Sequence, residues 1–402
     1  MKALYISYDG MTDPLGQSQV IPYLIGLTKK GYNFTILSYE KHHRYIQFGE
    51  TIRKQLRDNS IDWKPFRYHK RFSVAATSYD IFSGFLYLLF FIPVQRIRIL
   101  HCRSYISSIL GLLFRRIYGT KFIFDMRGFW ADERLEGGIF KGKYLYHLFK
   151  YLEKQFIKNA DAVIALTANS IDEMRTWPYI SKKYNSKFYH ITTCCDIKKF
   201  SQTYTLRTHK KNDIHSLNFV YVGSVGPWHS LPELTGFISL AYNYLPKSSF
   251  KILCNSSEEQ FFRFIKSNKL NIDRFVISSV LHNEIANHLT GTDIGFFFIP
   301  PVYSKIASSP TKLGEMLSSG IPVITGHSIG DTDRLITDNQ IGYVVRDFNE
   351  TEYKKAIDYV INLILKDGDK LSERCLKAAN DYFSLEKGIE RYNEIYTKLI
   401  NV

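Results

Sequence analysis

Apolar strand-like runs and amphipathic helical stretches alternate along the whole chain. The strands predicted in the first half are Ala3–Ser7, Asn33–Ser38, Ile99–Cys102, Lys121–Phe124 and Ala162–Thr167, with helices such as Gln19–Lys30, Ser78–Ile92, Ser104–Tyr118 and Lys143–Ala160 between them. The strands predicted in the second half are Leu217–Val222, Lys251–Cys254, Phe275–Ser278, Ile294–Phe298, Val323–Thr325 and Gly342–Val345, with helices such as Glu258–Asn268, Asn283–Thr290 and Thr351–Asp367. Because strands that alternate with helices form parallel, doubly wound sheets, the pattern predicts two Rossmann-like α/β domains.

The length of the chain supports this division. At 402 residues it is too long for one hydrophobic core. The segment 200–216 is polar and poor in aliphatic residues, and a new strand follows it directly. We therefore predict an N-terminal domain over 1–205, a C-terminal domain over 206–384, and a final helix within 385–402 that packs back toward the N-terminal domain.

No N-terminal signal peptide is visible, because the first residues are a short strand-like run ending at Asp9-Gly10. The five cysteines are odd in number and lack metal-type spacing, which fits a reducing cytosol. The most apolar run, Ile81–Val94, is shorter than the roughly 20 residues of a spanning helix, so we expect a buried or interface-lying helix. These features predict a cytoplasmic protein that can touch the inner membrane face.

Positive charge is concentrated in the first half. Residues 1–200 hold 31 basic and 16 acidic residues, whereas the remainder holds 22 of each, so the first half carries the whole net charge of +15. This asymmetry indicates an anionic partner such as a membrane surface, a lipid phosphate or nucleic acid, or else a solvated basic face. No nucleic-acid-binding module is recognisable, so we expect no nucleic acid partner.

The segment Ser308–Ile324 (SSPTKLGEMLSSGIPVI) reads as a polar loop, a short helix and a buried strand. Free N–H groups at the start of such a helix form an anion site, and Lys312 lies in its first turn. Glu315 lies one turn later and could accept two hydrogen bonds from a ribose diol. Ser309, Thr311, Lys312 and Glu315 are therefore candidate nucleotide contacts. An ordinary loop–helix–strand unit with solvated Lys and Glu remains the alternative.

Three other loops follow predicted strands, where open parallel sheets bind ligands. Gly16 and Gln17 belong to a glycine turn that opens a helix, and Gly223, Ser224 and Trp228 belong to a second turn that suits a diphosphate. The third loop, 125–138, combines charges of both signs, two aromatic residues and three glycines. Its carboxylates Asp125, Asp132 and Glu133 could orient hydroxyl groups, and its arginines Arg127 and Arg134 could bind phosphate in a bidentate way. Arg103, directly after the Ile99–Cys102 strand, is a further candidate substrate contact.

The sequence also argues against several familiar sites. The spacing of Gly223 and Gly226 is not the dinucleotide fingerprint, and no P-loop occurs. No His, Cys and Asp cluster has the spacing of a metal site, so we expect neither a bound metal nor another cofactor.

These segments together resemble the glycosyltransferases of family 4, retaining enzymes of the GT-B fold in which two Rossmann-like domains face each other across a cleft. The resemblance covers nearly the whole chain: the Gly16 turn, HCRS at 101–104, DMRGFWADE at 125–133, VGS at 222–224 and SPTKLGEMLSSGIPVI at 309–324. The family carries a Glu-x7-Glu motif, in which the second Glu binds the ribose and the first contacts the donor sugar. Glu315 matches the second Glu.

Three positions depart from the family pattern. Ala307 stands where the first Glu is expected, and Arg127 stands where many members have a histidine. The basic pair that usually follows the VGS-like strand is missing, so Lys312 is the first choice for the partner of the diphosphate.

The resemblance implies a metal-independent glycosyltransferase in surface polysaccharide biosynthesis. It would move a sugar from a nucleotide diphosphate to a hydroxyl of a glycan or lipid-linked acceptor and retain the anomeric configuration. Lys312 and Arg127 would be the catalytic residues, and the basic N-terminal half would bind the acceptor. The alternative function is a nucleotide-sugar-binding protein of the same fold without transfer activity, which Ala307 and Arg127 favour.

Overall fold

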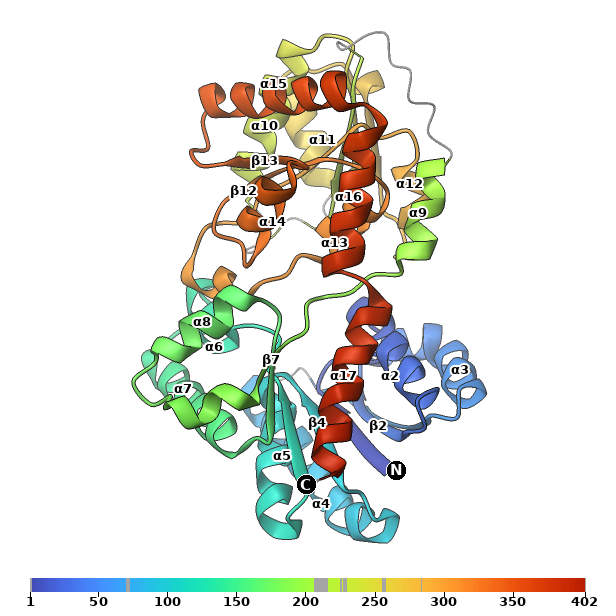
Figure 1. Ribbon diagram of the computed structural model, residues 1–402, viewed down its shortest axis with the longest axis vertical. Helices are drawn as coiled ribbons and strands as arrows, with labels where there is room; N and C mark the ends of the chain where they lie inside the picture. The colour runs from blue at the N-terminus through green and yellow to red at the C-terminus, as the bar shows by residue number, and fades with distance from the viewer. Residues whose placement is uncertain are drawn as a thin grey trace. The chain divides into compact units, whose positions relative to one another are not determined.

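The computed structural model describes residues 2–69, 73–205, 216–224, 226, 230–254, 258–282 and 284–401. These residues form two compact units. The first unit comprises residues 1–192 and 385–402, and the second comprises 193–384. Each described unit is built around one parallel β-sheet with helices on both sides (Figure 1).

The first unit contains a seven-stranded sheet in the order β3-β2-β1-β4-β5-β6-β7. The strands are β1 (Lys2–Ser7), β2 (Asn33–Glu40), β3 (Asp62–Arg67), β4 (Ile99–Arg103), β5 (Lys121–Asp125), β6 (Ala162–Ala165) and β7 (Phe188–His190). The central strands are almost continuously buried, as expected of a parallel sheet covered on both faces. The strand order reverses between β1 and β4, so their carboxyl ends form the position where such sheets bind ligands.

The helices of the first unit are α1 (Pro14–Gln19), α2 (Ile21–Thr28), α3 (His42–Asp58), α4 (Ser73–Gln95), α5 (Ser104–Tyr118), α6 (Trp130–Glu136), α7 (Lys143–Asn159), α8 (Ala168–Thr176) and α17 (Leu385–Ile400). The last of these comes from the C-terminus and lies against α2 (Figure 1). A Cβ at Gly26 would overlap the Ile389 side chain, so this glycine permits the close approach of the two helices.

The second unit contains a six-stranded sheet in the order β10-β9-β8-β11-β12-β13. The strands are β8 (Asn218–Val222), β9 (Ser249–Leu253), β10 (Phe275–Ser278), β11 (Ile294–Phe297), β12 (Val323–Gly326) and β13 (Gly342–Val345). The helices are α9 (Ile197–Thr205), α10 (Leu231–Tyr244), α11 (Glu258–Ser267), α12 (Ile285–Leu289), α13 (Thr311–Ser318), α14 (Thr332–Asn339), α15 (Glu350–Asp367) and α16 (Asp369–Tyr382). Its strand order reverses between β8 and β11, where β8 leads into the Gly223 turn.

The structure confirms the predicted fold class and differs from the prediction in several details. Strands β3 and β7 were not expected: β3 is a half-exposed edge strand with charged residues and Pro65, and β7 is only three residues long. The units divide at 192/193 rather than at 205/206, because α9 packs against α13 and Phe200 is buried in the second core. Part of the polar segment 200–216, on which the predicted boundary was based, is therefore helix.

Helix α4 also differs from the prediction. It is 23 residues long, so it is longer than the apolar run on which the length argument was based. Within the described ranges, it is the one helix that is long and apolar enough to cross a membrane by length and composition.

Candidate functional site

The Gly223 turn and helix α13 meet at the carboxyl end of β8 in the second unit. Gly223 has φ +139°, a conformation that favours glycine. A Cβ at this position would overlap the Nζ atom of Lys312. The structure therefore brings together two residues that the sequence placed in separate motifs, and it explains why the turn needs a glycine.

Lys312 is buried, with 9% of its surface exposed. Its Nζ atom has no hydrogen-bond partner among the described residues and lies 5.1 Å from the centroid of the Tyr221 ring and 5.5 Å from that of Phe297. Burial lowers the pKa of Lys312 to about 7, although Glu315 acts in the opposite direction. A buried ammonium without hydrogen-bond acceptors is costly, and a bound anion would remove that cost.

Glu315 lies one helical turn after Lys312 and is also buried. Its Oε1 atom is 2.8 Å from Nε2 of His282, which follows β10 and is partly exposed. From the sequence, the position of His282 after a strand fitted a contact to a nucleotide base and a loop cap equally well, and the structure places it against Glu315. His282 holds the Glu315 carboxylate in one orientation, as a diol acceptor requires.

The loop before α13 contains the other predicted contacts. The Ser309 hydroxyl lies 2.8 Å from that of Thr193, which also donates to the Ser309 carbonyl oxygen. Thr311 is the first residue of the helix and is partly buried. Ala307 is buried at the end of a 3-10 turn, so no carboxylate stands where the family has its first Glu.

A second polar cluster lies at the carboxyl ends of β4 and β5 in the first unit. Asp125 is buried, and its Oδ2 atom accepts a hydrogen bond from the Tyr392 hydroxyl (3.2 Å). Its Oδ1 atom lies 3.8 Å from Nη1 of Arg127, which has an unusual φ of +60°. Burial alone would raise the pKa of Asp125, but Arg127, His101 and Arg103 together outweigh burial and lower it.

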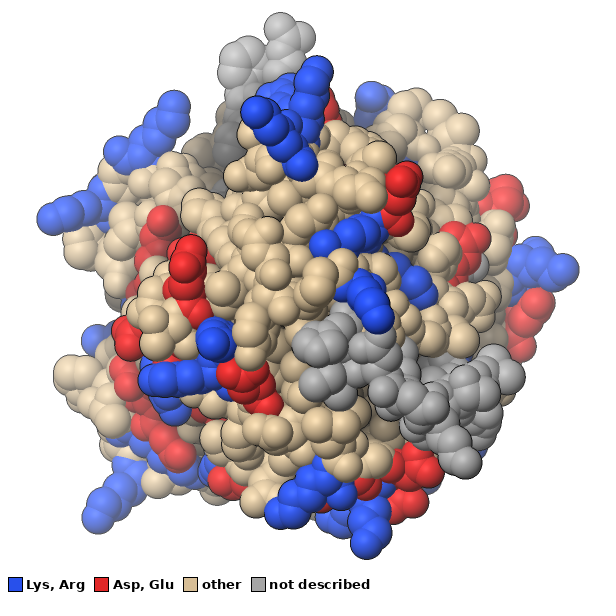
Figure 2. Space-filling model, turned by 90° about the horizontal axis from the view of Figure 1, so that it is seen from above, with Lys and Arg blue, Asp and Glu red and all other residues tan. Residues whose placement is uncertain are grey.

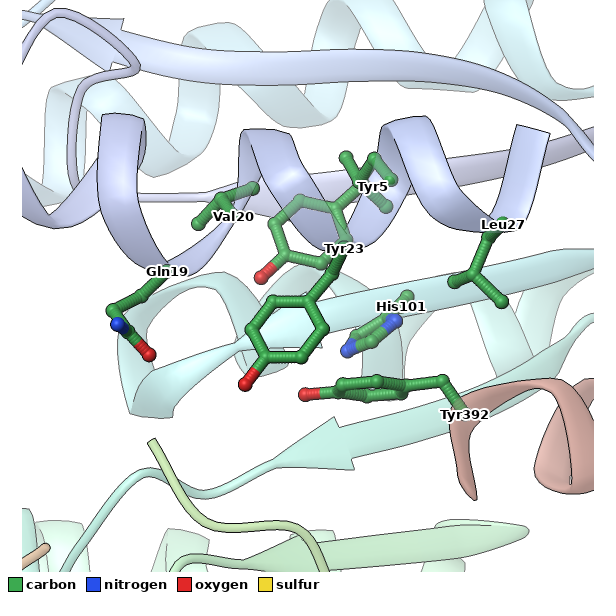
Figure 3. Close-up of a pocket in the computed structure, with 8 residues that line it drawn as sticks. Tyr5, Gln19, Val20, Tyr23, Leu27, His101 and Tyr392 are labelled. Carbon is green, nitrogen blue, oxygen red and sulfur yellow. The ribbon is translucent and has the colours of Figure 1, made fainter. Parts of the chain in front are cut away.

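His101 connects this cluster to the C-terminal helix. Its Nδ1 atom lies 2.9 Å from the Tyr396 hydroxyl, and its Nε2 atom lies 3.4 Å from Oδ2 of Asp125. Burial lowers the pKa of His101, which favours the neutral ring despite the adjacent Asp125. Figure 3 shows His101 with Tyr5, Tyr23 and Tyr392 around a narrow pocket beneath α2. No sequence signal pointed to Tyr392 and Tyr396, because Tyr392 is 267 residues from Asp125 and Tyr396 is 295 residues from His101.

Arg103 ends β4 beside Ser7 of β1, at the point where the strand order reverses. Its Nε atom lies 3.6 Å from Oδ2 of Asp9, which is half-exposed. The Nε and Nη1 atoms of both Arg103 and Arg127 are buried without a hydrogen-bond partner in the described part of the chain. The two guanidinium groups therefore retain donors that an anionic ligand could use.

Several of the predicted substrate-binding residues interact with other side chains of the protein. Asp132 accepts hydrogen bonds from the Tyr146 hydroxyl (2.9 Å) and the Lys150 ammonium (3.0 Å), which tie α6 to α7. Arg134 lies over the Trp130 ring at 4.3 Å, and Glu133 beside it is partly exposed. The roles of Asp132, Glu133 and Arg134 in substrate binding stay predictions.

Contacts within the protein explain why a glycine occupies position 16. A Cβ at Gly16 would overlap the Gly10 carbonyl oxygen, and Gln17 donates its side-chain N–H to the Thr12 carbonyl (3.0 Å). The Glu40 carboxylate accepts from the Met11 and Thr12 amides at 2.7 and 3.1 Å. These amides are therefore occupied, and the ligand contacts of Gly16 and Gln17 stay predictions. Trp228 lies outside the described residues.

Comparison with solved structures identifies the architecture. The chain is similar to a glycosyltransferase from Rickettsia africae ESF-5, with a TM-score of 0.71 and 16% sequence identity. The match covers 99% of this chain and 98% of the Rickettsia chain. Sucrose-phosphate synthase from Thermosynechococcus elongatus has a TM-score of 0.69 at 13% identity, with both chains covered in full. The chain has the GT-B fold. Anabaena HepE, solved with UDP-glucose, shares the GT-B fold at a TM-score of 0.67 and 13% identity over both whole chains.

Sequence comparison adds nothing further. No protein-family model and no curated protein sequence matches the chain. Because the sequence identities to the GT-B neighbours are low, these similarities establish the fold of the chain and not its substrates.

Proposed function

We propose that the protein is a retaining glycosyltransferase that moves a sugar from a nucleotide diphosphate to a hydroxyl of a glycan or lipid-linked acceptor. The observation that carries the proposal is the buried Lys312 ammonium beneath the Gly223 turn. An unpartnered ammonium at the switch point of a parallel sheet suits a diphosphate. GT-B neighbours solved with UDP, UDP-glucose or ADP support this choice of ligand class.

In the proposed reaction, the bond between the anomeric carbon and the diphosphate oxygen breaks, and the acceptor oxygen forms a new bond to that carbon on the same face of the sugar. The proton of the acceptor hydroxyl passes to the leaving diphosphate. Lys312 stabilises the negative charge that develops on the leaving diphosphate. Glu315, held by His282, accepts hydrogen bonds from the ribose diol. No metal takes part in this proposal, and transfer in the presence of EDTA would test that point.

The first unit would bind the acceptor. In the described part of the chain, Arg127 and Arg103 have N–H donors without a hydrogen-bond partner beside Asp125, so Arg127 would stabilise charge near the donor phosphate or orient the acceptor. We place the enzyme in the cytoplasm, at the inner membrane face, in the synthesis of a surface polysaccharide. The positive charge of the first half supports this location.

A panel of UDP-, GDP- and dTDP-sugars with lipid-linked and free glycan acceptors tests the proposal. We expect one donor to bind and to transfer its sugar with retained configuration, as read by NMR of the product. Ala307 favours a second candidate, a sugar-nucleotide-binding protein without transfer activity. Tight binding with neither transfer nor hydrolysis would support that candidate, and no binding by any nucleotide sugar would contradict both.

A further inference from the structure

Helix α4 has one face packed into the first unit and one apolar face exposed. The buried residues recur every four positions at Ala76, Asp80, Gly84, Leu88 and Ile92. Asp80 fixes this face, because its carboxylate accepts hydrogen bonds from the Tyr8 hydroxyl (2.9 Å) and the His69 amide (3.2 Å). A helix held in this way cannot be surrounded by lipid, so α4 does not cross a bilayer as part of this fold.

The opposite face of α4 is exposed and carries no charge. Its large apolar side chains also recur at helical spacing, at Tyr79, Phe82, Leu86, Phe90 and Val94. The most exposed are Phe90 at 70% and Val94 at 75%. Single exposed apolar residues are ordinary on soluble proteins, but a continuous stripe along a helix marks an interaction surface.

Helix α5 packs beside α4 and carries exposed apolar residues of its own. The Tyr118 hydroxyl donates to the Leu89 carbonyl (2.6 Å), and the Phe85 and Phe114 rings stack at 5.3 Å, so the two helices lie side by side (Figure 1). Leu113 and Ile117 of α5 are exposed as well. We call the exposed residues Tyr79, Phe82, Leu86, Phe90, Val94, Leu113 and Ile117 the α4/α5 face.

Basic residues accompany the α4/α5 face. Arg96 and Arg98 follow α4 directly and are exposed, and Arg116 is exposed on α5 between Leu113 and Ile117. The one acidic residue of α4, Asp80, is buried on the other side. An apolar helix face with basic residues and no exposed acid is the pattern of helices that lie in the plane of an anionic membrane.

The second unit offers a contrast. From residue 201 onward the chain holds 22 basic and 22 acidic residues. Figure 2 shows basic and acidic side chains interspersed on the face that it draws. The basic excess of the sequence lies entirely in the first 200 residues. The charge distribution therefore favours the first unit as the part that meets an anionic surface.

We propose that the α4/α5 face binds the surface of an anionic phospholipid bilayer, with α4 lying flat at the headgroup level. The aromatic and aliphatic side chains would enter the boundary of the acyl chains, and Arg96, Arg98 and Arg116 would contact lipid phosphates. The inference extends the proposed function by naming the surface that brings a lipid-linked acceptor to the enzyme. Vesicle binding does not need a donor or an acceptor, so it can be tested separately from transfer.

The test is co-sedimentation of the full-length protein with vesicles of phosphatidylcholine alone or with phosphatidylglycerol. We expect binding to the anionic vesicles that weakens at high salt. The double variant Phe82→Ser/Phe90→Ser should bind at least about tenfold more weakly. The matched control is Ile46→Ser, since Ile46 is 71% exposed on α3 outside the α4/α5 face. This control should bind like the wild type.

A second variant tests the charges. Replacing Arg96, Arg98 and Arg116 by Gln should weaken binding to anionic vesicles roughly fivefold per charge, from about 1 kcal/mol each, and leave the melting temperature unchanged. Equal binding of the wild type and the Phe82→Ser/Phe90→Ser variant would overturn the proposal. The proposal would also be overturned if the wild type did not bind vesicles but self-associated, and the Phe82→Ser/Phe90→Ser variant did not self-associate. The α4/α5 face would then bind a second copy of the chain.

Discussion

The two polar clusters, one in each unit, are built on opposite principles. In the second unit, the Lys312 ammonium is buried beside aromatic rings without a hydrogen-bond acceptor among the described residues. In the first unit, Asp125 already faces Arg127, His101 and Tyr392. The Lys312 ammonium therefore lacks an acceptor until an anion enters, whereas the Asp125 carboxylate already has partners from the protein, and the unbonded donors beside it belong to Arg103 and Arg127. Under the proposed function, the Lys312 cluster would bind the donor and the Asp125 cluster would position groups for the acceptor.

Replacing Lys312 should have the largest effect. Because Lys312→Met removes the positive charge that would stabilise the leaving diphosphate, we expect the transfer rate to fall by roughly 10²–10³-fold. The free protein should melt at the same or a higher temperature, since a costly buried ammonium is gone. Initial rates and thermal melts measure the two effects.

Lys251→Met is the matched control for this variant. The Lys251 ammonium donates to the carbonyl oxygens of His288 (3.0 Å) and Thr290 (2.8 Å), so its loss should lower the melting temperature and leave nucleotide affinity unchanged. A clear loss of stability in Lys312→Met would mean that Lys312 is a structural residue. The Lys312 cluster would then not differ from the Asp125 cluster in its need for an anion.

Glu315→Ala should have the next largest effect. We expect nucleotide binding to weaken by about 1.5–3 kcal/mol, because charged hydrogen bonds to the ribose are lost. His282→Ala should weaken binding less, since it removes only the group that orients Glu315. Unchanged affinity for UDP and GDP, measured by calorimetry, would exclude Glu315 from the ribose site.

Gly223→Ala tests whether the Gly223 turn is part of the nucleotide site. The new Cβ meets Lys312 Nζ, and φ at this position is unfavourable for alanine, so we expect a destabilisation of about 1–3 kcal/mol and weaker nucleotide binding. Gly368→Ala is the control, because Gly368 also has positive φ (+50°) and nothing lies near its Cβ position. If both variants bound nucleotide equally well, the turn would not be part of the site.

Asp125→Asn should have the smallest effect on nucleotide binding. It should leave the affinity unchanged and reduce stability by about 3–5 kcal/mol, because Arg127 loses its buried counter-charge. Chemical denaturation and nucleotide titration together measure this. A loss of nucleotide affinity without a loss of stability would show that the cluster in the first unit serves the donor.

The sequence predicted the fold well, because the buried parallel strands leave a strong apolar pattern, as in β1 and β5. It missed the edge strand β3, where Pro65 and charged residues interrupt that pattern. Lys312 and Glu315 were recognisable because one short motif carries both. Tyr392 and Tyr396 were not, since only the folded position of α17 brings them to His101 and Asp125.

The exposed stripe on α4 shows another limit of the sequence. The run Ile81–Val94 reveals an apolar helix, but not which of its faces is buried. Burial at every fourth residue depends on contacts such as that of the Tyr39 hydroxyl with the Asp80 carbonyl (2.7 Å), and these appear only in the structure.

The most direct test of the donor site is the pH dependence of nucleotide-sugar binding by the wild type and Lys312→Met. The pKa of Lys312 is about 7 in the free protein, and a bound diphosphate would raise it by stabilising the ammonium. Binding above pH 7 therefore takes up a proton, and wild-type affinity should fall by up to about tenfold per pH unit between pH 7.5 and 8.5. Lys312→Met should show no such fall. A flat wild-type profile, or the same slope in both proteins, would contradict the account.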